Sequence, residues 1–403
     1  MSAPEPIRFG ADELLRTPER FGRTARLGLV TNDAARLAAD ASLRTRVALQ
    51  RAGLPLARLF SPEHGLAARA PDGAAVGDAL DAHTGLPVVS LYGEQMRPPA
   101  AALAGLAAVL FDVPDVGARF YTYIWTLSHV LDVCAEAGVP LLVLDRPNPL
   151  GGELARCEGP LLDEARCASF LGRAALPVRH GLTAGEFARL WQRERQPGAA
   201  LEVVPARGWR RTALWPELRL PWVPPSPAMT SFDAALLYPG LCLFEATNLS
   251  AGRGTRWPFQ VIGAPWLDAG RLAERLRAHS LPGVSVQPLR FTPAQAPHAG
   301  LSCEGVRLRV ENVAAVRPVA LGLRLLAEVV ALRQPQFAWA RYPTAANPTG
   351  AGHFERLVGR PGLREKLEAG AERLDDARLQ EWTAAPGWAA RAEPCLLYAG
   401  VRG

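Results

Sequence analysis

Two aspartates, an arginine and two tyrosines follow a short apolar run in the stretch AAVLFDVPDVGARFYTY, residues 107–123. Carboxyl groups next to an arginine and aromatic rings suit general acid–base catalysis and the binding of polyhydroxylated ligands. A structural role explains these residues equally well, since aspartates also cap helices and close turns. Taken alone, the stretch marks a candidate site without fixing its chemistry.

Glu63 is a second candidate for chemistry, in the segment Ser-Pro-Glu-His-Gly at residues 61–65. It follows a predicted strand between a proline and a glycine, so its position is rigid, and partial burial favours the neutral form of a carboxyl group. Glycoside cleavage needs one protonated carboxyl group and usually a second carboxylate near the anomeric carbon. We choose Glu63 as the general acid and His64 as its hydrogen-bonding support; a turn carboxylate is the alternative reading.

The elements that must position these residues are short apolar runs separated by stretches of helical periodicity. We predict strands over residues 26–31, 56–60, 87–91, 107–111 and 139–144, and helices over 40–52 and 119–137. This alternation indicates an α/β domain with a Rossmann-like, mainly parallel sheet.

The carboxyl ends of parallel strands meet at one edge of a sheet, where open α/β sheets bind ligands. Each of the five predicted strands ends in a polar segment, so we expect these segments to converge. Asp115 or Asp112 would then assist Glu63, and we take Asp115 as the second catalytic residue. The binding candidates from these and later polar segments are Asn32, Tyr92, Asp112, Arg119, Tyr121, Tyr123, Arg146, Asn148, His180, Glu245, Asn248 and Arg253.

A proline-dense segment at residues 220–229 is either a linker or a wall of the cleft. We place the domain boundary just beyond it. Residues 1–233 would form the Rossmann-like domain with the catalytic motifs. Residues 234–403 mix predicted helices and strands, and would form a smaller α+β domain that closes the cleft.

Composition narrows the classes of function. The chain has 403 residues, 49% hydrophobic and 21% charged, which is ordinary for a globular protein. Its net charge of +6 comes from scattered arginines, with Lys366 the only lysine, so we predict no nucleic-acid partner. The sequence as given shows neither a signal peptide nor an apolar run of ~18 residues, which predicts a cytoplasmic protein without a membrane span.

Motifs for common cofactors are missing. No G-x-G-x-x-G turn follows the first predicted strand, and the chain has no Walker A, H-E-x-x-H or G-x-S-x-G motif. The six cysteines include no C-x-x-C pair, so we expect reduced core thiols and no zinc site. We therefore expect no cofactor or metal, and a cleft of carboxylates, amides, arginines and aromatics that suits a sugar.

Six segments together resemble the NamZ-like exo-β-N-acetylmuramidases. They are FSPEHG (60–65), GLPVVSLYG (85–93), DVPDVGARFYTY (112–123), DRPNP (145–149), RHG (179–181) and CLFEATNLSAGRGT (242–255). The resemblance covers most of the chain and implies release of terminal N-acetylmuramic acid from non-reducing ends of peptidoglycan fragments. It also implies a site between the two domains, with the catalytic glutamate at Glu63. Alanines at 67, 228, 246 and 251 depart from the family pattern, which makes substrate preference the property most open to change.

In this interpretation Arg119, Arg253 or Arg146 would pair with the lactyl carboxylate of a small muramic acid-containing saccharide. Cytoplasmic placement fits recycling of imported cell-wall fragments. A non-catalytic protein that binds acidic sugars, and a hydrolase for an amide or a phosphate ester, are the rival hypotheses. Retention or inversion of configuration, substrate length and oligomeric state stay open.

Overall fold

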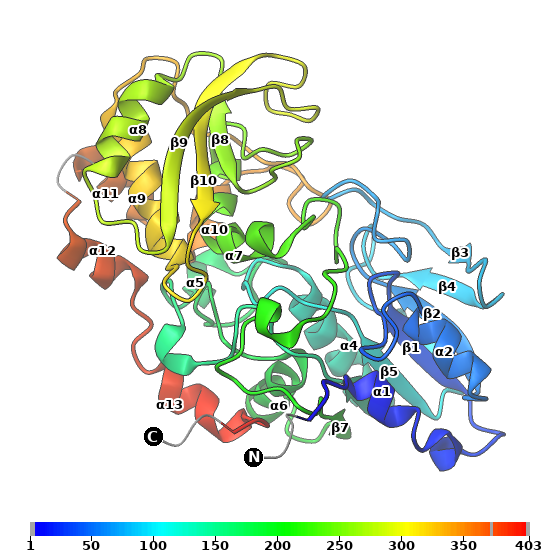
Figure 1. The fold of residues 1–403 in the computed structure, drawn as a ribbon. Coiled ribbons are helices and arrows are strands. Elements are labelled where there is room, and N and C mark those ends of the chain that lie inside the picture. Colours follow the sequence, from blue (N-terminus) through cyan, green and yellow to red (C-terminus); the bar gives the residue numbers. More distant parts are fainter. Residues whose placement is uncertain (1–4, 371–373, 400–403) are drawn as a thin grey trace.

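The computed structural model describes residues 5–370 and 374–399. Its larger sheet has seven strands in the order β3-β4-β2-β1-β5-β6-β7, all parallel except β3, which runs antiparallel to β4 (Figure 1). The strands are β1 (Leu27–Thr31), β2 (Leu56–Ser61), β3 (Ala79–Leu80), β4 (Pro87–Ser90), β5 (Ala108–Asp112), β6 (Leu141–Leu144) and β7 (Leu201–Val204). The predicted Rossmann-like, mainly parallel sheet is confirmed.

Helices cover both faces of this sheet because successive strand residues point to opposite sides. Leu29 and Leu110 pack with α1 (Gly10–Leu14) and α2 (Thr45–Arg51) in one core. Val30 and Phe111 belong to the larger core on the other face. The helices of that core include α4 (Tyr123–Ala137) and α6 (Ala184–Arg195). Both faces are therefore buried, as the continuous apolar strands predicted.

The strand order creates a crevice at one place on the sheet edge. β1 lies between β2 and β5, so the chain leaves β1 in one direction and returns to pair with its other side. The loops that follow β1 and β5 diverge at such a switch point, and open α/β sheets bind ligands there.

The turn before α4 differs from prediction. The helix expected over residues 119–137 begins only at Tyr123, because Gly117 has a φ of 77° and the residues after it form turns. Arg119 and Tyr121 therefore precede the helix instead of lying in its first turn. α6 begins directly after Thr183, which forms a capping box with Glu186.

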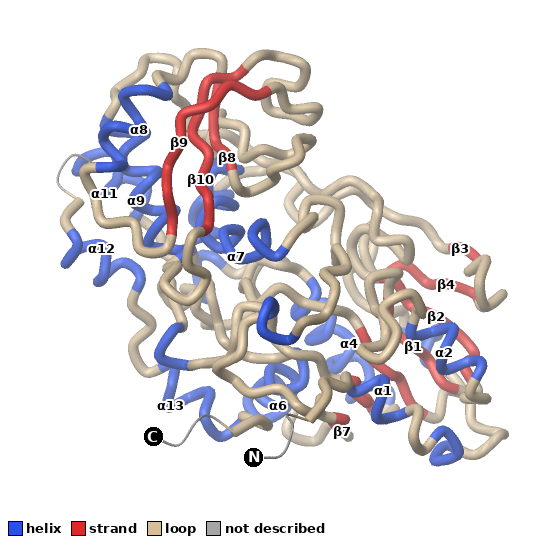
Figure 2. The backbone as a smooth tube through the Cα atoms, viewed as in Figure 1, coloured by secondary structure: helices blue, strands red, loops and turns tan. Residues whose placement is uncertain are grey.

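The second half of the chain forms a smaller antiparallel sheet in the order β8-β10-β9, shown apart from the first sheet in Figure 2. The strands are β8 (Val261–Ala264), β9 (Val284–Phe291) and β10 (Cys303–Val310). The helices are α7 (Phe232–Leu241), α8 (Ala269–Arg277), α9 (Pro318–Ala331), α10 (His353–Val358), α11 (Leu363–Gly370), α12 (Asp376–Thr383) and α13 (Trp388–Ala392). This is the α+β arrangement expected for the second half. Two short helices in the first half complete the set, α3 (Ala100–Leu103) and α5 (Glu164–Cys167).

α7 and α9 cross at very short distance. A β-carbon at Gly240 would lie 1.9 Å from the carbonyl oxygen of Pro318, so only glycine permits this contact. The crossing holds α7, and the segment that follows it, against the rest of the second half.

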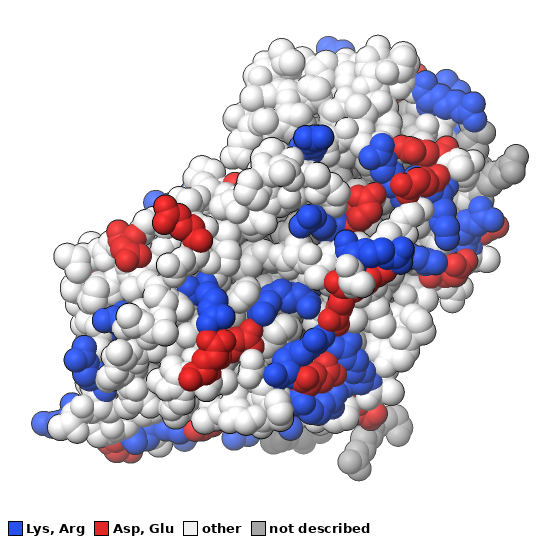
Figure 3. Space-filling view, turned by 180° about the vertical axis from the view of Figure 1, so that it is seen from behind, with Lys and Arg blue, Asp and Glu red and all other residues white. Residues whose placement is uncertain are grey.

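On the face shown in Figure 3, positively and negatively charged side chains lie next to one another in groups, with uncharged surface between the groups. Among the described residues, no helix is long and apolar enough to cross a bilayer.

Candidate active site

The segment after β2 presents Glu63 to a partly open cavity. His64 has a φ of 67° and Gly65 a φ of 70°, so two consecutive residues adopt the left-handed conformation directly after the glutamate. A non-glycine residue in this conformation is strained, and such strain clusters at functional sites. The tight turn fixes the direction in which Glu63 leaves the sheet edge.

The Glu63 carboxyl group is 8% exposed and is held from two sides. Oε1 accepts a hydrogen bond from the backbone N–H of Gly73 at 2.9 Å. Oε2 accepts a hydrogen bond from Oγ1 of Thr122 at 2.6 Å. Thr122 is the N-cap residue of α4, yet its side chain does not cap the helix. The hydroxyl group therefore forms its hydrogen bond with Glu63 and not with an N–H group of the helix.

Two further carboxyl groups line the Glu63 cavity, and one arginine holds both. Arg253 donates from Nε to Oε1 of Glu245 at 2.6 Å and from Nη1 to Asp72. Glu245 belongs to the second half of the chain, whereas Asp72 follows β2, so the ion pairs join the two halves across the cavity. His64 lies beside this network, with Nδ1 on the carbonyl of Ala70 at 2.8 Å and Nε2 3.7 Å from Asp72.

Tyrosine rings form much of the remaining wall. Tyr92 follows β4, and burial together with the nearby Glu63 carboxylate raises the pKa of its phenol. Tyr121 packs edge-to-face on Tyr238 with ring centroids 5.9 Å apart. Tyr342 also lines this cavity, and it comes from a loop that no sequence pattern singled out. Burial lowers the pKa of His353, also in this wall, to about 4, so its imidazole is neutral at pH 7.

The structure therefore brings six predicted site residues into one cavity: Glu63, His64, Tyr92, Tyr121, Glu245 and Arg253. The lining residues that the sequence analysis missed include Asp72, Thr122, Tyr342 and His353. Thr122 stands inside the predicted stretch FYTY and Asp72 lies nine residues after Glu63, so proximity to a motif was their only signal.

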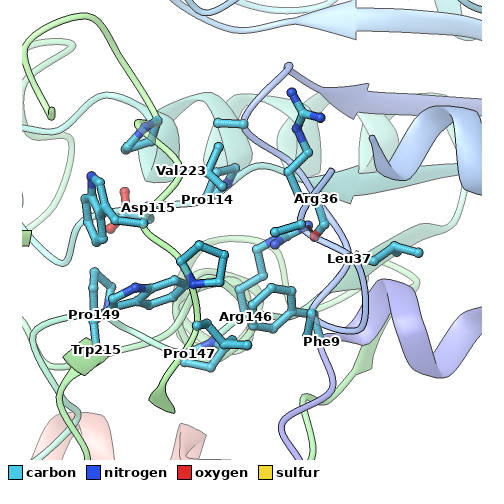
Figure 4. A pocket seen from close by; sticks show the side chains of 17 residues that line it. Phe9, Arg36, Leu37, Pro114, Asp115, Arg146, Pro147, Pro149, Trp215 and Val223 are labelled. Atoms are coloured by element: carbon cyan, nitrogen blue, oxygen red, sulfur yellow. Dashed lines mark hydrogen bonds between the residues drawn. The ribbon is translucent and has the colours of Figure 1, made fainter. Parts of the chain in front are cut away.

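Asp115 does not line the Glu63 cavity, so its pairing with Glu63 is corrected. Its Oδ2 accepts the N–H of Gly117 at 2.6 Å, which turns the side chain toward the carboxyl ends of β1 and β6. There Asp115 and Arg146 line a second, partly open cavity (Figure 4). Burial raises the pKa of the Asp115 carboxyl group to about 7.

Arg146 and Asp112 form a buried ion pair. Arg146 donates from Nε to Oδ1 at 2.5 Å and from Nη2 to Oδ2 at 3.0 Å. Asp112 is completely buried, so it is a partner of Arg146 and not a direct contact for a ligand in either cavity.

Arg119 is completely buried and does not face the cavity. Its guanidinium group donates to the carbonyl oxygens of Pro160, Leu176 and Leu357, at 2.9, 2.7 and 2.6 Å. Burial lowers its pKa to about 9, because the charge has no nearby carboxylate. The prediction that Arg119 pairs with a substrate carboxylate is therefore wrong. Arg119 instead holds three chain segments together.

Asn32 and Tyr123 lie between the two cavities. Asn32 donates from Nδ2 to the Tyr123 hydroxyl at 3.3 Å, and that hydroxyl donates to the carbonyl of Pro225 at 2.8 Å. Pro225 lines the second cavity and Ser226 the Glu63 cavity. The proline-dense segment 220–229 is thus a wall of both cavities, one of its two predicted roles.

Three remaining candidates hold loops together. Asn148 donates to the carbonyl of Leu182 at 2.9 Å and packs against Gly117, where a β-carbon would lie 2.4 Å from its Oδ1. Asn248 donates from Nδ2 to the carbonyl of Gln336 at 2.7 Å. His180 is fully buried and accepts at Nδ1 from the N–H of Leu182, and burial lowers its pKa to about 3.

Comparisons with known proteins agree over most of the chain. Residues 27–233 match the family model described as exo-beta-N-acetylmuramidase NamZ, N-terminal, and residues 236–398 match its C-terminal counterpart. The peptidoglycan beta-N-acetylmuramidase NamZ of Bacillus subtilis (strain 168) is 38% identical over 366 residues, 90% of this chain and 85% of that protein.

Two crystal structures of DUF1343 family proteins from Bacteroides fragilis NCTC 9343 have similar folds. One has a TM-score of 0.83 at 27% identity, covering 98% of this chain and 99% of that one. The other has a TM-score of 0.73 at 26% identity, covering 98% of this chain and 100% of that one.

Proposed function

The chain belongs to the exo-β-N-acetylmuramidase NamZ family, and we propose that its Glu63 cavity is where terminal N-acetylmuramic acid is cleaved from the non-reducing ends of peptidoglycan fragments. The protein is accordingly a glycosidase. The observation that carries the site assignment is the contact between Glu63 and Thr122, which joins the two polar segments best suited to chemistry.

Glu63 acts as the general acid. Its protonated carboxyl group donates to the glycosidic oxygen as the bond from that oxygen to the anomeric carbon breaks. The Thr122 hydroxyl can accept or donate, so it supports Glu63 before and after this transfer. The N–H of Gly73 keeps the other carboxyl oxygen in place.

Asp72 and Glu245 are the other carboxyl groups in this cavity that can face an oxocarbenium-like transition state. Arg253 holds both in place through ion pairs, and one of them guides the water molecule that adds to the anomeric carbon. The tyrosine rings of the wall pack against the apolar face of the sugar. Asp115 has no part in this step, since it lines the other cavity.

Arg253 is the arginine placed to recognise the lactyl carboxylate. The guanidinium group of Arg119 already donates hydrogen bonds to three carbonyl groups, and Arg146 lines the second cavity. Neither is therefore placed for this contact. Because Arg253 already bonds two carboxylates, we expect only a modest preference for muramic acid over N-acetylglucosamine from charge alone.

We propose the two-domain division at residues 233/234. The seven-stranded sheet ends at Val204 and the three-stranded sheet begins at Val261, and the two family models meet between them. This boundary falls in the first turn of α7, so a cut before its N-cap, Ser231, would keep that helix whole.

We also propose a cytoplasmic role in recycling cell-wall fragments. The six cysteines are free thiols and five of them are buried, which fits a reducing compartment. Fractionation of cells that express the protein tests this placement, and recovery outside the cytoplasm would oppose it.

The function is tested by incubating the protein with chromogenic β-glycosides of N-acetylmuramic acid and of N-acetylglucosamine. We expect release of N-acetylmuramic acid, with activity that is unchanged by a chelator. Tight binding of either glycoside without turnover would instead favour a sugar-binding protein. Activity that depends on added divalent metal would favour a phosphate-ester hydrolase.

A further inference from the structure

The second cavity occupies the position where open α/β sheets bind ligands. It is lined by residues that follow β1, β5 and β6, among them Leu37, Pro114 and Pro147, and the segment 215–225 covers it (Figure 4). β1 and β5 flank the switch point of the sheet, whereas Glu63 follows β2. The fold's usual ligand position is therefore distinct from the Glu63 cavity.

Polar atoms in this cavity lack partners within the described residues. Arg146 is 8% exposed, and although Nε and Nη2 bond Asp112, no described residue accepts a hydrogen bond from Nη1. Asp115 Oδ1 is buried without a partner, and so is Nε1 of Trp215. An unpaired buried polar group is costly, so Oδ1 of Asp115 and Nε1 of Trp215 point to a ligand with matching groups, and Nη1 of Arg146 is a further donor without a partner among the described residues.

The remaining walls are apolar and rigid. Trp215 and Trp222 meet edge-to-face with ring centroids 5.5 Å apart, and the Arg146 guanidinium stacks over Phe9 at 4.6 Å. Prolines and small aliphatic side chains make up most of the rest, with Arg36 as the one other charged side chain. Such walls bury an apolar body and leave polar contacts only to its ends.

We propose that the second cavity binds a short peptide with small apolar side chains and free charged ends. The peptide carboxylate bonds Nη1 of Arg146, its ammonium group bonds Asp115, and a peptide carbonyl accepts from Trp215. The apolar side chains pack between the tryptophans and prolines.

The charges favour a peptide over a second sugar ring. A pyranose carries hydroxyl groups around its whole rim, and this cavity offers them few partners. Asp115 and Arg146 follow the neighbouring strands β5 and β6, and apolar side chains line most of the remaining wall, so the cavity matches a ligand with two polar ends and an apolar middle.

Two sources carry the terminal carboxylate and the apolar side chains: a free peptide, which also has the ammonium group, and a peptide attached to the muramic acid of a substrate, whose amino end is bonded to the lactyl carbonyl. The second source rests on the proposed function, whereas binding of a free peptide does not. Binding and turnover are therefore measured separately.

Calorimetry with alanyl-alanine, free at both ends, tests the proposal directly. We expect saturable binding that Val223→Trp, which fills this cavity at a residue that does not line the Glu63 cavity, weakens at least tenfold. Asp115→Asn and Arg146→Gln should each weaken it about tenfold, the effect of ~1.4 kcal/mol. The N-acetylated dipeptide should lose the contribution of Asp115, and the carboxamide that of Arg146.

Thermal unfolding of each variant separates loss of the cavity from loss of the fold. If wild-type protein shows no saturable binding of the dipeptide, or if Val223→Trp binds it equally well, the proposal is overturned. Saturable binding of N-acetylglucosamine that Val223→Trp abolishes, with no dipeptide binding, would replace the peptide with a sugar.

The source is read from KM values for muramic acid glycosides with and without an attached peptide. Val223→Trp should leave KM for the peptide-free glycoside unchanged. A higher KM for the peptide-bearing glycoside alone identifies the substrate's own peptide, and equal values identify a free peptide. An enzyme without activity on either glycoside would refute the proposed function and leave the calorimetric result standing.

Discussion

Thr122 donates a 2.6 Å hydrogen bond to Glu63, so a residue at the start of one helix orients a carboxyl group that follows a different strand. The two residues are 59 positions apart in the chain. This contact determines where the Glu63 carboxyl group points.

Glu63→Gln should lower kcat for a chromogenic muramic acid glycoside by about 10²–10⁴-fold, because the amide cannot donate the proton. KM should change little, since the amide fills the same volume. Steady-state kinetics measures both constants. A variant that keeps wild-type kcat would refute the assignment of Glu63 as the acid.

Thr122→Val should lower kcat by about tenfold, since Oε2 of Glu63 loses a hydrogen bond worth ~1–1.5 kcal/mol. Thr122→Ser is the matched control, because it keeps the hydroxyl and should restore most of kcat. Both variants should melt near the wild-type temperature, as the Thr122 side chain does not cap α4. Equal activity of the valine and serine variants would show that the contact is irrelevant to catalysis.

Arg119→Met should reduce the free energy of unfolding by about 3–5 kcal/mol, since three buried carbonyl groups lose a charged donor. Arg290→Met is the control, because the Arg290 side chain is 73% exposed and its loss should cost little. Urea denaturation measures both. If Arg119→Met is as stable as wild type but has a higher KM, Arg119 contacts substrate after all.

Asp115 should make stability depend on pH. Burial raises its pKa from 3.8 to about 7, so between these values the folded protein holds a proton that the unfolded chain has lost. The free energy of unfolding therefore falls as pH rises through this window. Asp115→Asn should reduce the fall in the free energy of unfolding between pH 4 and pH 8 by about 1–4 kcal/mol. Urea denaturation at several pH values measures this difference. An unchanged pH profile would contradict the raised pKa.

Arg253 and Asp72 should be energetically coupled across the Glu63 cavity. We expect a double-mutant cycle with Arg253→Gln and Asp72→Asn to give a coupling of about 1–3 kcal/mol in stability. Of the two single variants, Arg253→Gln should lower the free energy of unfolding more, because it leaves Asp72 and Glu245 facing each other without a cation. Additive effects would mean that the ion pair contributes no stability.

The sequence determined the parallel sheet and the edge at which its strands end in polar segments. Apolar runs such as β1 and β5 are local signals, and parallel pairing then follows from the helices between them. The capping box of Thr183 and Glu186 is equally local, and α6 begins directly after it opens. Glu63, at the end of β2, could be selected in the same way because a strand end, a proline and a glycine restrict it.

Only the tertiary structure decided how that edge divides into two cavities. Asp115 and Glu63 both follow parallel strands, yet loop dihedral angles and the Tyr123–Pro225 contact turn them into separate spaces. Arg119 and Arg253 are the same residue type near glycines. The carbonyl groups around Arg119 lie 41, 57 and 238 positions away in the chain, and Arg253 joins the nearby Glu245 to Asp72, 181 positions away. Such partners come from anywhere in the chain, so no local pattern encodes them, and side-chain direction emerges only when the elements pack.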